Sequence, residues 1–236
     1  MPTSPHFAPS PSGEYRCREN LNLYTSSACT GLATQAVAGR QLRIIGAEGD
    51  AVRVQLCEDD YPAWLALSDR TLIEPAPMAY HAVRVERDEI ERRIEGAIAF
   101  ARAAMAQPHH YLWGGTVAPD YDCSGLMQAA FASVGVWLPR DSYQQGAFTA
   151  AIAFDQLQPG DLIFFQEPEK NRISHVALYA GAAGYLHSSG VQRGRNGIGI
   201  DPFTADGSEI GSRYYPLRHS AGRIMHSYQP GDGWNQ

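Results

Sequence analysis

Cys123 stands between an aspartate and a serine at the start of an apolar helical pattern, in the stretch YDCSGLMQAAF. The N-terminus of a helix offers unpaired backbone N–H groups and the positive end of the helix dipole, and both stabilise a thiolate. The ordinary alternative is a packing residue, because free cysteine is among the most buried residue types. Its position at the helix start favours Cys123 as a nucleophile.

A cysteine nucleophile needs a base from elsewhere in the chain. His175 and His187 lie in two predicted strands, ISHVALYAG and GYLHSSG. Their separation of 12 positions is even, so both side chains are expected on one face, opposite each other if the turn is centred near Gly181. His175 would take the thiol proton, and His187 would fix its ring and tautomer. The alternative for each is a hydrogen-bonded core histidine.

Helices followed by an antiparallel sheet are expected to position these residues. RDEIERRIEGAIAFARAAMAQ repeats apolar residues at helical spacing, with Asp88 as the expected N-cap and Pro108 as the stop. A second helix is expected from Cys123 to about Val134, ended by Gly135. Strands follow in PGDLIFFQ and in the two histidine segments, while RGRNGIGIDPF is predicted to be a loop. This unit, residues 88–236, is therefore α+β.

The first part of the chain is predicted to be a small β-barrel over residues 14–75. QLRIIGAEGDAVRVQLCEDDYPAWLAL alternates apolar and polar residues between turn signals, which is typical of such barrels. Residues 1–13 are rich in proline and are predicted to be mobile. Residues 76–87 are predicted to be a linker.

Charge and cysteine usage exclude several function classes. The net charge of −6 argues against a nucleic-acid binder or a binder of anionic membranes. No stretch approaches the roughly 18–20 apolar residues of a membrane span, and the N-terminus lacks a secretory signal pattern, so a cytoplasmic protein is expected. The four cysteines form no CxxC pair, so neither a metal site nor a disulfide scaffold is predicted.

Five sequence blocks carry a family resemblance. WGG, DCSGL, PGDL, SHV and HSS occur in this order between about residues 88 and 220. In these blocks the chain resembles the NlpC-type cell-wall peptidases, which are papain-like cysteine peptidases. The resemblance implies a triad of Cys123, His175 and His187, and no metal or organic cofactor.

The N-terminal unit narrows the resemblance. NLNLYTSSACTGLATQAVAGRQLRII is similar to the opening of a bacterial SH3-like domain, with Tyr24 where an arginine is common. A chain with both parts resembles the γ-D-glutamyl-L-diamino-acid endopeptidases. It implies hydrolysis of the bond between D-γ-glutamate and diaminopimelate in murein tripeptides or tetrapeptides with a free N-terminal L-alanine, during cell-wall recycling. It also implies contact between the SH3-like and catalytic domains.

Further site residues follow from the resemblance. Tyr111 would donate its hydroxyl toward the developing oxyanion, and Asp122 would accept the ammonium group of the substrate. Four further residues would line the substrate: Ser124, Asp141, Ser142 and, from the SH3-like domain, Tyr61. Asp122 is also a common helix cap, and Tyr61 is also compatible with a barrel-core aromatic.

Three other functions stay open. A secreted hydrolase would act on intact wall, and a cysteine-dependent amidase or acyltransferase would use the same fold for another reaction. A non-catalytic binding module is the third alternative, although the chain retains its cysteine and both histidines.

Overall fold

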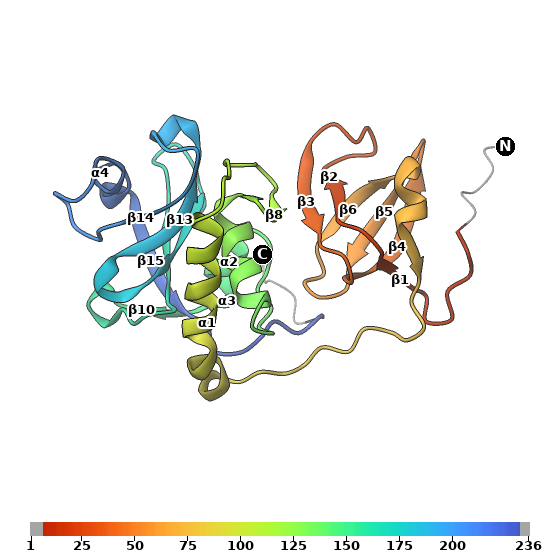
Figure 1. Ribbon diagram of the computed structural model, residues 1–236, viewed down its shortest axis with the longest axis horizontal. Coiled ribbons are helices and arrows are strands. Elements are labelled where there is room, and N and C mark those ends of the chain that lie inside the picture. The colour runs from red at the N-terminus through yellow and green to blue at the C-terminus, as the bar shows by residue number, and fades with distance from the viewer. Residues whose placement is uncertain (1–6, 232–236) are drawn as a thin grey trace. The chain divides into compact units, whose positions relative to one another are not determined.

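The chain forms two compact units in the computed structural model, which describes residues 7–231 (Figure 1). One unit comprises residues 7–82 together with Gln229–Gly231, and the other comprises residues 83–228. Residues 229–231 thus belong with the first unit, where the Gly231 amide donates to Asp60 Oδ2 at 2.6 Å. Each unit has its own apolar core.

The first unit is the expected small all-β domain. Its antiparallel strands form one seven-stranded sheet in the order β3-β2-β6-β5-β4-β1-β7, around a core that includes Leu23, Leu42 and Val54. The strands are β1 (Glu14–Cys17), β2 (Leu21–Tyr24), β3 (Leu32–Ala36), β4 (Gln41–Glu48), β5 (Ala51–Leu56), β6 (Pro62–Ala66) and β7 (Ile73–Pro75). The predicted period-2 alternation is confirmed over β5, where Val52, Val54 and Leu56 are fully buried.

The proline-rich segment before β1 packs on this sheet where it is described. Residues 1–6 of the segment predicted to be mobile lie outside the described residues. The ring of Phe7 meets that of Tyr15 edge-on with centroids 5.7 Å apart, and Ser12 donates to the Ala76 carbonyl at 2.8 Å. These contacts hold residues 7–12 against β1 and β7.

The second unit is built on a six-stranded antiparallel sheet with the order β10-β15-β11-β12-β13-β14. Its strands are β10 (Ala150–Ile152), β11 (Leu162–Phe165), β12 (His175–Tyr179), β13 (Tyr185–Ser189), β14 (Gly197–Asp201) and β15 (Arg218–Arg223). A separate two-stranded ribbon, β8 (Thr116–Val117) with β9 (Asp120–Tyr121), precedes the cysteine. The segment predicted to be a Gly-rich loop therefore contains a strand, β14.

Four α-helices belong to the second unit. They are α1 (Arg87–Met105), α2 (Cys123–Ala132), α3 (Ser142–Phe148) and α4 (Glu209–Tyr214). Helix α1 begins one residue before Asp88, because Glu86 pairs its backbone with His226 and stays extended, so Asp88 lies in the first turn and is not the N-cap. Short 3₁₀ turns occupy Leu67–Leu72, Phe154–Gln156, Gly181–Ala183, Val191–Arg193 and Tyr215–Leu217.

Helix α2 lies between α1 and the sheet. It contacts α1 on one side and β12 and β13 on the other (Figure 1). Eight of its ten residues are buried, so its apolar pattern is nearly continuous rather than one-sided. This central helix brings its first residue, Cys123, against the strands that carry the two histidines.

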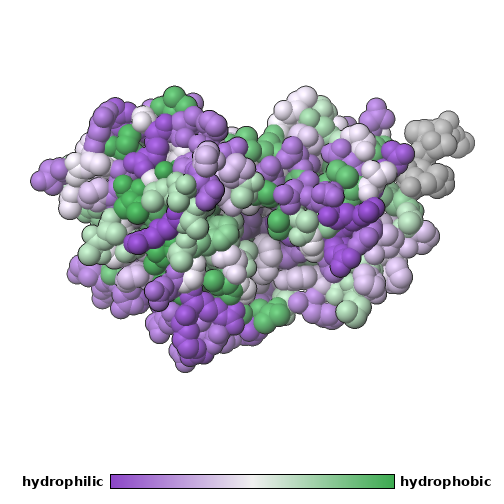
Figure 2. All heavy atoms as spheres, viewed as in Figure 1, coloured by the Kyte–Doolittle hydropathy of each residue, from purple (hydrophilic) through white to green (hydrophobic). Residues whose placement is uncertain are grey.

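The surface view mixes polar and apolar side chains over each unit (Figure 2). Large apolar side chains that are exposed include Met78, Val83 and Trp113. Within residues 7–231, no helix combines the length and the apolar character that a bilayer span requires.

Candidate active site

Glycines shape the backbone before Cys123 and let it approach helix α2 closely. Gly114 adopts a φ of +81°, which a glycine tolerates without steric cost. The Asp122 amide then donates to the Gly115 carbonyl at 3.1 Å. A Cβ on Gly125 would lie 2.0 Å from that same carbonyl oxygen, so only glycine fits there. The glycines of the WGG and DCSGL blocks therefore let the loop and helix α2 meet.

Asp122 caps helix α2 and binds Arg140. Its Oδ1 accepts from the Gly125 amide at 2.6 Å, and its Oδ2 accepts from the Gly114 amide at 2.8 Å. Arg140 donates to Oδ1 at 3.1 Å and to Oδ2 at 2.6 Å, with its side chain only 1% exposed. Ser124 accepts a further bond from Arg140 at 3.0 Å. This buried network fixes the first turn of α2.

Asp122 and Ser124, expected to line the substrate, both have partners within the protein. Both carboxylate oxygens of Asp122 already accept bonds from protein donors, and the residue is buried. The Asp122 side chain keeps 9% of its area exposed. Ser124 is also buried, and its hydroxyl is used by Asp122 and Arg140. Both residues therefore fix the first turn of α2, and their expected substrate roles stay predictions.

Cys123 is buried, with 7% of its area exposed. Burial, and next the charge of Asp122, raise the pKa of its thiol to about 12, although the backbone N–H groups of Val176 and Ser124 act in the opposite direction. The free thiol is thus neutral, whereas the helix start alone favours a thiolate. Because the Val176 amide reaches the sulfur, Cys123 lies beside the residue that follows His175.

The two histidines are bonded to each other. His175 Nε2 and His187 Nδ1 are 2.8 Å apart, and both rings are buried. The strands pair Leu178 with Leu186 and Tyr179 with Tyr185, so continuing this register sets His187 opposite Ala177. The expectation that the histidines face each other directly is therefore wrong by two residues. They are diagonal neighbours on one face, because their separation is even.

Asp201 extends this array and was missed at the level of sequence. His187 Nε2 lies 2.7 Å from Asp201 Oδ2, and both side chains are fully buried. Strand β14 pairs His187 with Gly199, so Asp201 is two residues further along and on the same face. The available signal was its even separation of 14 positions from His187. That signal has meaning only once 197–201 is assigned as a strand.

Burial keeps both histidines neutral. The pKa of His175 falls well below 6.5 because of burial and then the neighbouring His187. Burial likewise lowers the pKa of His187, although Asp201 opposes the shift. A neutral imidazole at position 175 can accept a proton from the neutral thiol.

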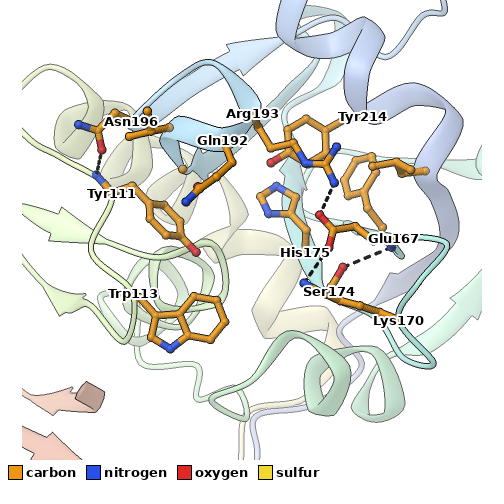
Figure 3. Close-up of a pocket in the computed structure, with 14 residues that line it drawn as sticks. Tyr111, Trp113, Glu167, Lys170, Ser174, His175, Gln192, Arg193, Asn196 and Tyr214 are labelled. Carbon is orange, nitrogen blue, oxygen red and sulfur yellow. Dashed lines mark hydrogen bonds and ion pairs between the residues drawn. The ribbon is translucent and has the colours of Figure 1, made fainter. Parts of the chain in front are cut away.

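A pocket of about 560 Å³ opens beside His175 (Figure 3). Tyr111 and Trp113 line one side, and the Tyr111 hydroxyl faces into the pocket. The Tyr111 backbone pairs with Tyr121, two residues before Cys123, and its amide donates to Asn196 at 3.2 Å. Burial and the proximity of Cys123 raise the pKa of Tyr111, so its hydroxyl keeps its proton. Tyr111 can therefore donate a hydrogen bond near the sulfur.

The other side of the pocket is charged. Glu167 forms ion pairs with Lys170, at 2.7 Å, and with Arg193. Tyr214 stacks on the His175 ring with centroids 4.5 Å apart and a tilt of 28°. The pocket thus combines a histidine, a phenol, an exposed indole and charges of both signs.

Three predicted substrate residues lie outside the lining of this pocket. Asp141 is the N-cap of α3 in a capping box with Gln144, and burial raises the pKa of its carboxyl. Ser142 is buried at the first position of α3. Tyr61 packs against the core of the first unit, and its amide donates to Asp59 at 3.2 Å. Their substrate roles stay predictions.

Within residues 7–231, no group of three or more His, Cys, Asp or Glu side chains has a geometry that could hold a metal ion. What the arrangement can do is nucleophilic catalysis: a thiol, a neutral base beside it, and a phenol donor in the adjacent pocket.

Two parts of this chain match known protein families. Residues 108–208, which hold the cysteine and both histidines, match the NlpC/P60 family. The chain carries an NlpC/P60 domain. Residues 23–69 match a second family, the bacterial dipeptidyl-peptidase Sh3 domain. The resemblance noted from the sequence is confirmed, as is the order of an SH3-like domain followed by a peptidase fold.

The curated relatives described next are similar to this chain over about a third of its length. A gamma-D-glutamyl-L-lysine dipeptidyl-peptidase of Bacillus cereus is 39% identical over 84 residues, covering 35% of this chain and 25% of the relative. A gamma-DL-glutamyl hydrolase of Bacillus subtilis is 40% identical over 81 residues, covering 34% of this chain and 20% of the relative. The matched region therefore spans a quarter or less of each.

Solved structures share the fold over more of the chain. An NlpC/P60 family protein from Bacillus cereus superposes with a TM-score of 0.50 at 23% identity, covering 90% of this chain and 63% of that one. NlpC1 from Trichomonas vaginalis gives a TM-score of 0.51 at 15% identity, covering 95% and 97%. At these identities the similarity establishes the fold alone.

Proposed function

We propose that this chain is a cysteine endopeptidase that hydrolyses the γ-D-glutamyl-L-diamino-acid bond of peptidoglycan stem peptides with a free N-terminal L-alanine. The carrying observation is the array of Cys123, His175 and His187 within an NlpC/P60 domain, with His175 lining a pocket. The names of relatives that act on γ-glutamyl bonds support the choice of bond.

The first half of the reaction uses the neutral pair. His175 takes the proton from Cys123, and the sulfur attacks the γ-carbonyl carbon of D-glutamate. The resulting oxyanion accepts hydrogen bonds from the Cys123 amide, one of the unpaired N–H groups at the start of α2, and from the Tyr111 hydroxyl. His175 then gives its proton to the departing amine, which leaves as the free diamino acid.

The second half returns the enzyme to its starting state. A thioester now joins Cys123 to the γ-carbonyl carbon. Water attacks this carbon while His175 accepts one of its protons. The tetrahedral intermediate collapses, the sulfur leaves and regains the proton from His175. The products are L-Ala-D-Glu and the diamino acid, with no change in oxidation state.

The lining of the pocket suits a substrate that carries both signs of charge. A stem peptide has carboxylate and ammonium groups near the scissile bond. Arg193 and Lys170 can meet a carboxylate, and Glu167 can meet an ammonium group. Trp113, whose side chain is exposed at the rim, offers an apolar surface to the aliphatic part.

Hydrolysis of L-Ala-γ-D-Glu-meso-diaminopimelate tests the reaction. We expect release of free diaminopimelate by the wild-type chain and loss of at least about 10³-fold in rate for Cys123→Ala. The N-acetylated tripeptide serves as the control for the free amino group, and we expect it to be a poor substrate. Full activity of the Cys123→Ala chain would refute the proposal.

A role in cell-wall recycling inside the cytoplasm is part of the proposal, and intact wall is its rival substrate. The comparison is between soluble tripeptide and purified sacculi at matched bond concentration. Recycling predicts rapid cleavage of the tripeptide and little release of product from sacculi. Fractionation of cells that express the untagged protein tests the cytoplasmic location. An added amine acceptor separates hydrolysis from acyl transfer, which would produce a new amide.

A further inference from the structure

Three side chains donate four hydrogen bonds to Asp201, which lies at the end of the histidine array. Its Oδ2 accepts from His187 Nε2 at 2.7 Å, and Arg195 reaches both oxygens at 2.9 and 2.7 Å. Ser208 donates to Oδ1. Burial alone would raise the pKa of this carboxyl, but His187, Ser208 and Arg195 outweigh burial and lower it. Asp201 is therefore a carboxylate that can only accept hydrogen bonds.

An acceptor at this place determines which nitrogen of each ring carries a proton. His187 is neutral and must donate Nε2–H to Asp201, so its Nδ1 carries a lone pair. His187 Nδ1 can then only accept, which requires His175 to donate Nε2–H across the 2.8 Å contact. The Nδ1 of His175 is left with the lone pair. This is the nitrogen that can take a proton.

We propose that Asp201 is a positioning residue that sets the tautomers of both histidines and so makes His175 Nδ1 the base for Cys123. Its effect reaches the sulfur through two rings, and Asp201 itself touches neither substrate nor thiol. The inference rests on the proposed function, in which His175 acts as the base. It extends the array of three residues to four.

The isosteric variant Asp201→Asn is expected to move the proton of each histidine ring to the other nitrogen. Arg195 donates to both oxygens and Ser208 donates to Oδ1 alone, so we expect the asparagine carbonyl oxygen at the Oδ1 position and the amide NH₂ facing His187. His187 Nε2 must then accept, so its Nδ1 is protonated and donates to His175 Nε2. The proton of His175 moves to Nδ1. The base of the wild-type chain is thereby blocked without a change in side-chain shape.

Ring-nitrogen NMR of the ¹⁵N-histidine-labelled full chain reads the tautomers directly. We expect both His175 and His187 to be protonated on Nε2 in the wild-type chain, and both on Nδ1 in Asp201→Asn. The His175→Gln and His187→Gln chains assign the signals. A wild-type spectrum with His187 protonated on Nδ1 would overturn the proposal, even if Asp201→Asn does not fold.

Kinetics supply the second readout. We expect kcat/KM for the tripeptide to fall by about 10²-fold or more in Asp201→Asn. Arg195→Gln is the matched control, since it removes the ion pair with Asp201 but leaves the carboxylate, so the tautomers should stay as in the wild-type chain. The positioning role of Asp201 is refuted if Asp201→Asn keeps the wild-type tautomers. It is also refuted if the tautomers switch and kcat/KM does not fall. Absence of hydrolysis by the wild-type chain would instead refute the proposed function and leave the NMR result intact.

Discussion

Arg140 binds both carboxylate oxygens of Asp122 from the loop before α3, at 3.1 and 2.6 Å, in a site closed to solvent. The same carboxylate caps helix α2 through Gly125 and orders the loop through Gly114. Cys123 follows Asp122 directly, so the position of the sulfur depends on this ion pair. The pair supports the nucleophile without lining the pocket.

Arg140→Met is expected to destabilise the second unit by about 3–5 kcal/mol, because it leaves the buried carboxylate of Asp122 without its charge partner. Denaturant unfolding followed by tryptophan fluorescence measures this loss. Arg92→Met, which breaks an exposed pair with Glu89, is the control and should change little. Adding Asp122→Asn to Arg140→Met should recover part of the loss. An Arg140→Met chain as stable as the control would contradict this account.

Gly125→Ala tests the close approach of helix α2 to the WGG loop. The added methyl would lie 2.0 Å from the Gly115 carbonyl oxygen, which belongs to backbone and cannot rotate away. We expect destabilisation at or above the upper end of the ~1–3 kcal/mol range for overpacking, and loss of activity as Cys123 is displaced. Gly46→Ala, whose methyl would meet only Arg53 Cβ at 3.6 Å, should have a small effect.

Tyr111→Phe removes the proposed phenol donor and keeps the ring. Each oxyanion donor contributes about 10²–10³ in kcat, so we expect a drop of at least about 10²-fold in kcat with KM little changed. Tyr179→Phe, on the strand of His175 but outside the pocket lining, should keep near wild-type kcat. A purely ground-state role for the hydroxyl would instead raise KM and leave kcat unchanged.

The buried thiol predicts a specific pH profile for alkylation. Because burial raises the pKa of Cys123 to about 12, the rate of its reaction with iodoacetamide should keep rising with pH beyond pH 9. Mass spectrometry of the labelled peptide gives the rate at this cysteine separately from the other three. A plateau below pH 8 would show that the thiolate and a protonated His175 already form an ion pair in the free protein.

The neutral histidines predict acid lability. The pKa values of His175 and His187 are lowered in the folded chain, so below pH 6.5 the unfolded chain binds protons that the folded chain does not. Their contribution is complete above pH 6.5 and is lost as the pH falls, by up to about 1.4 kcal/mol per pH unit for each residue. Unfolding between pH 5 and 7.5 measures the slope. The double variant His175→Gln/His187→Gln should show a shallower one; an equal slope would assign the lability to other groups.

The local sequence pattern was enough to predict the helix that bears the nucleophile and the strands that bear the two histidines. A helix start at Cys123 follows from Asp122 and the apolar run behind it, and α2 begins at that residue. An even separation places His175 and His187 on one face whatever the turn does, since side chains alternate along strands. Their exact register could not be predicted, because it depends on where the hairpin turns, and the pairing is offset by two residues from a centre at Gly181.

The partners of these residues were decided by tertiary structure. Asp122 has a helix-capping pattern in any fold, yet its second oxygen is engaged because Arg140, 18 positions away, is folded against it. Asp201 joins the histidines only because β14 pairs with β13. Burial of Cys123 depends on the sheet that covers α2, so it also could not be inferred from the helix start.

The sequence by itself determined the residue types, the helix start and the shared strand face, because these depend on nearest neighbours and on a period of two. Tertiary structure decided which carboxylate binds which partner and which titratable groups are neutral. Hydrogen-bond partners and desolvation are set by segments that are distant along the chain, and a local pattern carries no information about them. For this chain, that is why Asp122 positions the nucleophile and Asp201 completes the array.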